Sequence, residues 1–150
     1  MSKTKTNSVN VLRTYDQCLM YLEDIMGSKE TNEDLDYIGK KIFKDRFIGV
    51  FTSDKMPLIH NNEMFIINNK SSREKGEHWL ACYKWKNKLY IYDSFARKVI
   101  TLSSLWKNKN NIVDANRYRD ESYKEKNCGQ RCIAWLICFD KWKDGIIKII

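Results

Sequence analysis

The stretch "HWLACYKWKNKLYIYDSF", residues 78–95, decides how the middle of the chain folds. Two runs within it, 78–85 and 88–95, are rich in aromatic and β-branched residues, as β-strands are. Only "KN" separates them, and so short a connection predicts a tight β-hairpin. The outer ends of the paired strands, which carry His78 and Asp93, would then lie close together. We therefore expect Asp93 to hydrogen-bond the His78 imidazole and to fix its tautomer.

Further elements are indicated on both sides of this hairpin. Helices are predicted over 15–26, 32–44, 129–142 and, more briefly, 103–108, and further strands over 47–51 and 63–69. Thr31 is the expected N-cap of the second helix, with Asp34 at its third position. The order of helices, then strands, then a helix indicates an α+β fold.

Composition indicates one domain with a real core, because the chain has 150 residues of which 43% are hydrophobic. We expect a flexible tail over residues 1–10, a single domain over 11–150 and a polar surface segment over 107–127. No apolar stretch approaches the roughly 18 residues that span a bilayer, and the N-terminus lacks the apolar core of a signal peptide. An odd number of cysteines, five, favours an intracellular protein with reduced thiols over a secreted one.

Near the C-terminus, "KNCGQRCIAWLICF", residues 126–139, places Cys128 at the start of a buried helix. The positive end of the helix dipole favours a thiolate there, and a neighbouring imidazole would complete a cysteine nucleophile. Gly129 leaves room for a substrate carbonyl, and backbone N–H groups at the helix start suit a developing oxyanion. His78, Asp93 and Cys128 are therefore the candidate catalytic residues.

Each of these residues also has a simpler explanation, as a small core residue, a turn residue or a polar surface group. Zinc bound by Cys128, Cys132 and Cys138 is a competing interpretation, but the chain has no CxxC pair and no histidine near these thiols. Cys132 and Cys138 lie among Ile, Trp, Leu and Phe, as core residues do, so no metal is expected. His60 is predicted to lie at the surface or at the rim of the site.

Four blocks of the sequence, in this order, resemble the adenovirus-type maturation proteases (adenain), and within them the enzymes of virophages and polinton-like elements. The blocks are "TNEDLDYIGKKIFKDRFIGVFTSDKMP" (31–57), "FIINNKSSREKGEHW" (65–79), "LYIYDSFAR" (89–97) and "NCGQRCIAW" (127–135). The resemblance covers roughly residues 30–141. It implies a circularly rearranged papain-like α+β fold, in which a central mixed sheet packs against helices and the nucleophile begins a buried helix.

The resemblance also assigns roles to individual residues. It implies that His78 is the general base, Asp93 its orienter and Cys128 the nucleophile, with Gly129 beside the oxyanion. The positions that it assigns to the substrate groove are Gly76, Glu77 and Trp79.

The chain departs from the family pattern at Glu121, where the family has an oxyanion-donating Gln about seven residues before the nucleophile. An ionised Glu would repel the oxyanion, and losing one donor costs about 3–4 kcal/mol of transition-state stabilisation. The donor in place of the Gln is then Asn127, a backbone N–H or a protonated Glu121. A different alignment of this loop is the other explanation. The chain also has no cysteine between Cys82 and Cys128 to receive the family's disulfide-linked peptide, so no cofactor is required.

The function implied by the resemblance is that of a monomeric cysteine endopeptidase, a thiol protease of virion maturation. It would cleave viral capsid precursor polypeptides near Gly-rich sites, in the virion and the host-cell virus factory, away from membranes. A ubiquitin-like-protein deconjugating protease shares the same residue order. A decayed, non-catalytic protease fold that binds nucleic acid is the third hypothesis, because the family's oxyanion Gln is missing and the net charge is +8. The intact set of His78, Asp93 and Cys128 argues against decay. The same charge leaves stimulation by DNA open, although the lysines are scattered along the chain.

Overall fold

Three α-helices and a five-stranded sheet make up the part of the chain that the computed structural model describes, residues 7–27, 31–68, 78–94, 111–115, 127–147 and 149–150. The helices are α1 (Ser8–Met26), α2 (Asn32–Phe43) and α3 (Cys128–Trp142), and the strands are β1 (Phe47–Phe51), β2 (Met64–Asn68), β3 (Trp79–Trp85), β4 (Lys88–Tyr92) and β5 (Ile112–Asp114). The sheet order is β1-β2-β3-β4-β5, with the outer pairs parallel and the inner pairs antiparallel. The predicted α+β class and mixed sheet are therefore confirmed.

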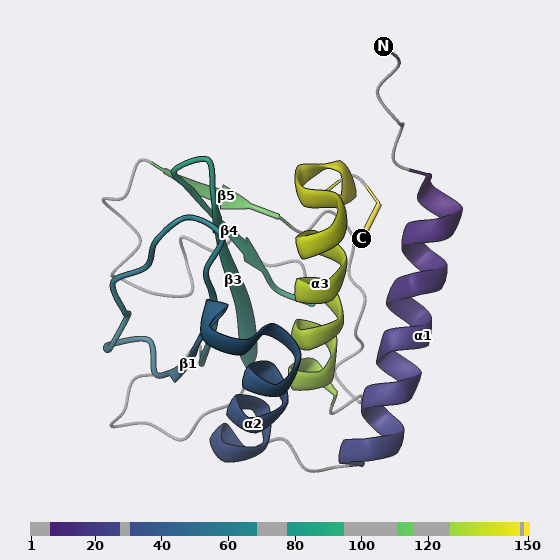
Figure 1. Cartoon of the computed structure of the whole chain (residues 1–150), viewed down its shortest axis with the longest axis horizontal. Helices are drawn as coiled ribbons and strands as arrows, with labels where there is room; N and C mark the ends of the chain where they lie inside the picture. Colours follow the sequence, from purple (N-terminus) through teal and green to yellow (C-terminus); the bar gives the residue numbers. More distant parts are fainter. Residues whose placement is uncertain (1–6, 28–30, 69–77, 95–110, 116–126, 148) are drawn as a thin grey trace.

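The described elements form layers in which α3 lies between the sheet and α1 (Figure 1). On this face of the sheet, Trp135 and Phe139 of α3 stack against aromatic residues of β3 and β4. The opposite face carries a second, smaller core of buried residues, Phe65, Ile67, Leu80, Cys82 and Ile91. Because β3 is buried on both faces, its sequence is almost continuously apolar rather than alternating.

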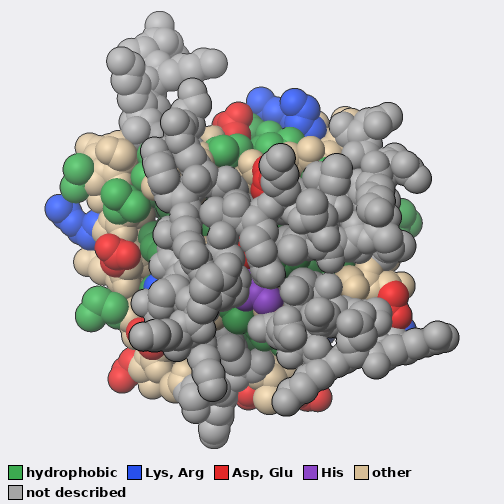
Figure 2. All heavy atoms as spheres, turned by 180° about the vertical axis from the view of Figure 1, so that it is seen from behind, with side chains coloured by type: hydrophobic (Ala, Val, Ile, Leu, Met, Phe, Trp, Pro, Cys, Tyr) green, Lys and Arg blue, Asp and Glu red, His purple; other side chains and the backbone are tan. Residues whose placement is uncertain are grey.

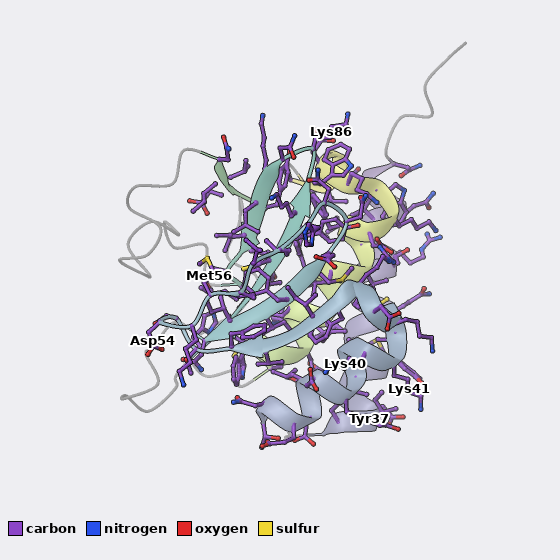
Figure 3. The ribbon with its side chains drawn as sticks, turned by 60° about the vertical axis from the view of Figure 1, so that its left-hand side comes forward. Tyr37, Lys40, Lys41, Asp54, Met56 and Lys86 are labelled. Carbon is purple, nitrogen blue, oxygen red and sulfur yellow. The ribbon has the colours of Figure 1, made fainter. Side chains whose placement is uncertain are left out.

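β3 and β4 are joined by the predicted tight turn, at Lys86 and Asn87, which both have positive φ (50° and 63°). Asn61 holds the turn through two hydrogen bonds of 2.9 Å, one to the side chain and one to the backbone N–H of Asn87. The Lys86 ammonium, at the tip of the hairpin (Figure 3), lies 4.5 Å from the centroid of the Trp85 ring. The turn fixes the register of the two strands and brings their open ends, with the predicted site, side by side.

α2 begins with the cap that the sequence predicts. The Thr31 hydroxyl accepts a hydrogen bond from the Asp34 N–H at 3.2 Å, and the Asp34 carboxylate accepts one from the Thr31 N–H at 3.3 Å. Gly39, an unfavourable residue inside a helix, has a packing reason. A Cβ at this position would lie 2.5 Å from the Phe47 ring, so only glycine lets α2 approach β1 this closely.

α1 begins at Ser8, seven residues before the predicted start at residue 15. Asn7 caps it, because its side-chain oxygen accepts a hydrogen bond from the Val9 N–H at 2.9 Å. The prediction of a flexible tail over residues 1–10 is therefore wrong for residues 8–10, which are helical. One fully buried residue near this end, Val11, gives the first turns of α1 a contact with the core.

β5 lies inside the segment 107–127, which was expected to be polar surface. Its residues pair in parallel with β4, and the Ala115 N–H that follows donates to the Ile91 carbonyl at 2.8 Å. Ala115 is fully buried, so the prediction is wrong for this part of the segment. Three residues are too few to show a strand periodicity. The short helix predicted over 103–108 lies outside the described residues.

Charged side chains of both signs are interspersed on the described surface. Figure 2 shows basic side chains at separate places on one face, with acidic and apolar ones between them. Tyr37, Lys40 and Lys41 project from α2 (Figure 3), and Lys40 pairs with Asp36 at 3.1 Å. None of the helices in the described ranges is long and apolar enough to cross a bilayer.

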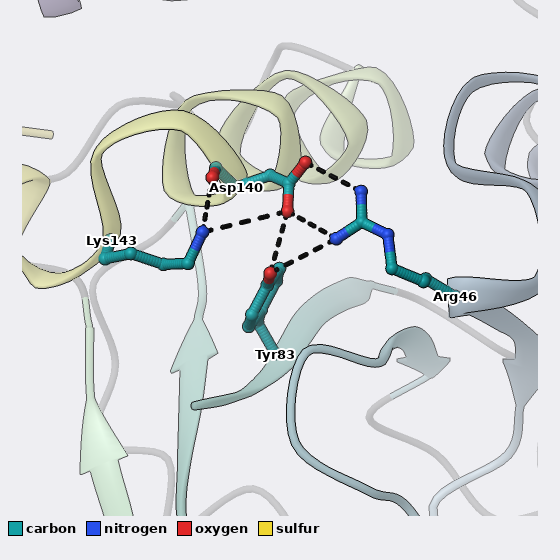
Figure 4. A network of polar contacts seen from close by, with 4 residues as sticks. All are labelled: Arg46, Tyr83, Asp140 and Lys143. Atoms are coloured by element: carbon teal, nitrogen blue, oxygen red, sulfur yellow. Dashed lines mark hydrogen bonds and ion pairs between the residues drawn. The ribbon is translucent and has the colours of Figure 1, made fainter. Parts of the chain in front are cut away.

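A network of polar side chains joins α3, β3 and the residue before β1 (Figure 4). Arg46 donates two hydrogen bonds to the Asp140 carboxylate, at 2.6 and 2.8 Å, and the Tyr83 hydroxyl donates a third at 2.7 Å. Lys143 donates to the backbone carbonyl of Asp140, and its ammonium lies 3.9 Å from the carboxylate. The hydrogen bonds from Arg46 are the largest cause of the lowered pKa of Asp140.

We expect Asp140→Asn to lower the free energy of unfolding by about 1–2 kcal/mol at pH 7, because charge-assisted hydrogen bonds are lost. The lowered pKa of Asp140 makes this stabilisation complete above pH about 4, and it is lost as the pH falls through the folded-state pKa. Urea unfolding at pH 7 and pH 3 should therefore show a smaller difference from the wild type at pH 3. Asp36→Asn, which breaks an exposed pair, is the control and should cost less than about 0.5 kcal/mol. An Asp140→Asn deficit equal at both pH values would contradict the charge-based explanation.

Candidate functional site

A buried histidine–aspartate pair stands at the open end of the hairpin. His78 directly precedes β3 and Asp93 directly follows β4, and the His78 Nε2 lies 2.6 Å from the Asp93 Oδ1. The side chains are 3% and 0% exposed, so the contact is shielded from water and correspondingly strong. The predicted hydrogen bond is confirmed. Because Nε2 faces the carboxylate, Nδ1 is the imidazole nitrogen on the opposite side of the ring.

Cys128 is the first residue of α3, where the sequence predicts the start of a buried helix. It is 6% exposed. Asn127 precedes it but does not cap the helix with its side chain. Its side-chain oxygen instead accepts a hydrogen bond from the Arg131 Nε at 3.0 Å, and its amide donates to Glu23 at 2.6 Å. The backbone N–H groups of the first turn lie outside the helix's own ladder, and the dipole there favours an anion.

Aromatic contacts show how α3 runs along the hairpin. The ring centroids of Phe139 and Tyr83 are 4.8 Å apart, and those of Trp135 and Tyr92 are 5.3 Å apart. Tyr92 pairs with Ala81, two residues before Tyr83 on β3. The four-residue step from Trp135 to Phe139 in α3 therefore covers about the same length, roughly 6 Å, as the two-residue step from Ala81 to Tyr83 in β3. It follows that α3 runs in the same direction as β3.

The same register locates the first turn of α3 relative to the histidine–aspartate pair. Cys128 lies seven residues before Trp135 in the helix, which corresponds to about 10 Å along its axis. A strand covers the same 10 Å or so in about three residues. Counting three residues back along the chain from Ala81, which lies level with Trp135, gives His78. By this reasoning the thiol stands level with the open end of the hairpin.

Burial favours the neutral thiol at two of the other described cysteines, Cys82 and Cys138. Burial raises the pKa of Cys82, and it is the main cause that raises the pKa of Cys138 to about 12. Cys132 is 1% exposed and packs in the main core, as predicted, together with Cys138. Among the described residues, no group of three or more His, Cys, Asp or Glu side chains could hold a metal ion.

The remaining predicted residues have different outcomes. Trp79 begins β3, half-buried, and packs against the main core, whereas Gly129 is buried as the second residue of α3. His60 is exposed, as predicted, with its ring 3.2 Å from the Glu63 carboxylate. Three predicted residues, Gly76, Glu77 and Glu121, lie outside the described residues.

α1 holds the first turn of α3 through contacts that the sequence did not indicate. Asn127 donates to the Glu23 carboxylate at 2.6 Å, Gln130 donates to the Gly27 carbonyl at 2.9 Å, and Arg131 donates to the Tyr15 hydroxyl at 3.4 Å. One of the three donors, Asn127, directly precedes Cys128, and the other two belong to the turn that Cys128 begins. The sequence offered one sign of these contacts, a polar hydroxyl at Tyr15 on the apolar face of α1. No pattern in the sequence says which residue this hydroxyl contacts.

Comparisons with known proteins leave the family unassigned. No family model matches the chain, and no curated protein shows significant similarity to it.

Proposed function

We propose that the chain is a cysteine endopeptidase in which Cys128 is the nucleophile, His78 the general base and Asp93 its orienter. The observation that carries the proposal is the buried 2.6 Å contact between His78 and Asp93. The residue rises along α3 and β3 support it, because they put the Cys128 thiol at about the same height as this pair. Burying an ionisable pair costs free energy, and buried ionisable groups are enriched in active sites. A thiol at a helix start, near an imidazole held by a carboxylate, has the surroundings of an activated nucleophile.

In the proposed mechanism, His78 Nδ1 takes the proton of the Cys128 thiol, and the thiolate attacks the scissile carbonyl carbon. When the C–N bond of the tetrahedral intermediate breaks, the imidazolium gives its proton to the leaving amine and a thioester remains. A water molecule that loses a proton to Nδ1 then attacks the thioester and the C–S bond breaks. The imidazolium returns this proton to the sulfur, so the acid product leaves and both the thiol and the neutral imidazole are restored. Asp93 stays ionised throughout and holds the imidazole through Nε2.

The first turn of α3 is the proposed source of oxyanion donors. The backbone N–H groups of Cys128 and Gly129 are at the positive end of the helix, and glycine allows a substrate carbonyl to come close. The Asn127 amide is a weaker alternative because it already donates to Glu23 at 2.6 Å. A protonated Glu121 remains the other side-chain hypothesis.

The proposed substrates are viral capsid precursors cleaved near Gly-rich sites during virion maturation, as the sequence resemblance implies. We would incubate the purified chain with such precursors, with ubiquitin-like proteins extended at their C-termini, and with DNA. Cleavage of the precursors, located by mass spectrometry, supports the proposal. Trimming of the ubiquitin-like proteins alone favours a deconjugating protease, and salt-sensitive DNA binding without cleavage favours the scaffold. Faster precursor cleavage on adding DNA would establish DNA as an activator.

Selective alkylation provides a substrate-independent prediction. At pH 6, iodoacetamide should modify Cys128 at least about tenfold faster than Cys18, because a thiolate reacts faster than a thiol. Cys18 is the internal reference, since it is only half-buried and burial raises its pKa. Peptide mass spectrometry over a time course gives both rates. Equal rates at the two cysteines would count against an activated nucleophile.

A further inference from the structure

A hydrogen bond connects α1 to the strand that leads into the acid. The hydroxyls of Tyr15 and Tyr92 lie 3.0 Å apart, and the side chains are 3% and 0% exposed. Tyr92 is the last residue of β4 and directly precedes Asp93. A phenylalanine would fill either position with the same ring, so the buried hydroxyls add a directional contact to the packing.

The same Tyr15 hydroxyl contacts the helix that begins with Cys128. Arg131, one turn after Cys128, donates from Nη1 to this hydroxyl at 3.4 Å and from Nε to the Asn127 side chain at 3.0 Å. Because guanidinium only donates, the Tyr15 oxygen must accept this bond. The chain of contacts therefore runs from the residue before the acid to the residue before the nucleophile.

The contacts of Tyr15 and Arg131 are needed to hold the first turn of α3, because the aromatic stacking fixes only the middle and the end of this helix. Trp135 and Phe139 pack on the hairpin, whereas Cys128 lies about 10 Å further along the helix axis. A small tilt of α3 about these rings would move its first turn relative to β4. Misplacement of a reacting group by 1 Å costs about 100-fold in rate. Glu23 adds a second attachment, because it accepts a hydrogen bond from Asn127.

We propose that α1 positions the nucleophile of the proposed protease against its acid–base pair, through a brace formed by Tyr15, Arg131 and Asn127. Tyr15 and Arg131 are positioning residues that act through the first turn of α3 and through β4. The inference rests on the proposed function and concerns a helix that precedes the segment, residues 30–141, in which the sequence resembles the maturation proteases.

A double-mutant cycle tests the brace, with Tyr15→Phe, Arg131→Met and the double variant. For each we would measure kcat and KM on the capsid precursor that the wild type cleaves, the rate of Cys128 alkylation by iodoacetamide, and Tm. Each single variant should lower kcat about tenfold to 100-fold with KM unchanged, and the double variant should match the singles. The alkylation rate should fall with the same coupling. Two exposed α1 residues give the controls, Tyr21→Phe and Arg13→Met, which should leave these values unchanged.

The outcomes separate the brace from the proposed function. Variants that lower Tm but leave kcat and the alkylation rate within twofold, or effects that multiply in the double variant, would overturn the brace while leaving the protease intact. If the wild type cleaves no precursor, the alkylation rates still decide the matter, and coupled losses there would support positioning of Cys128 although the protease proposal fails. If Arg131→Met does not fold, Arg131→Gln takes its place in the cycle.

Discussion

Cys128→Ala is expected to abolish precursor cleavage, with a fall in kcat of about 10⁵-fold, because alanine cannot form the thioester. The substitution should leave the fold intact, since Cys128 is small and stands at a helix start, outside the helix interior. The measurement is kcat from a mass-spectrometric time course, together with Tm to show that the variant is folded. Asp93 and His78 remain in place in this variant, so any residual rate reports what they achieve without a nucleophile.

Cys132→Ala is the matched control, one turn further along the same helix. Cys132 is 1% exposed and packs in the core, so its replacement should cost about 1 kcal/mol of stability through lost packing while kcat stays within twofold. The two variants thus separate a reactive thiol from a structural one. Cleavage that survives in Cys128→Ala, or is lost in Cys132→Ala without a loss of stability, would show that the nucleophile has been assigned to the wrong cysteine.

The features that were predictable from sequence depend on residues close together in the chain. Two residues between two strands of β composition fix the hairpin, and the hairpin brings His78 to Asp93 because its register follows from the turn. The α2 cap similarly needs only Thr31 and Asp34, three residues apart. In each case the local pattern and the tertiary structure favour the same conformation.

The features that were missed depend on contacts between distant parts of the chain. β5 has only three residues, too few to show a strand pattern in the sequence, and it is identified by its pairing with β4. The brace joins Tyr15 to Arg131, 116 positions later, and their pairing arises only when α1 packs on α3. Helix propensity disfavours glycine at position 39 of α2. The reason for a glycine there is the close approach of the Phe47 ring, which only the folded structure shows.

Asp93→Asn is expected to lower kcat about 10³- to 10⁴-fold while the protein stays folded. Asparagine has nearly the same shape, so the buried site remains filled and can still form a hydrogen bond to His78. The amide carries no charge to stabilise the imidazolium that forms when the thiol is deprotonated, and it can hold the imidazole in the wrong tautomer. The 2.6 Å contact with Nε2, closed to water, makes this dependence on Asp93 strong. The measurement is kcat at 25 °C beside Tm.

Asp140→Asn supplies the comparison, because it makes the same chemical change at a carboxylate bound to Arg46 and Tyr83. Asp140 lies twelve positions after Cys128, near the end of α3, so this variant should lose stability and keep kcat within twofold. Asp93→Asn should show the opposite pattern, a large loss of kcat with a smaller change in Tm. If both variants lose activity only in proportion to the fraction that unfolds, the buried pair at His78 is a structural contact and the proposed acid–base role is wrong.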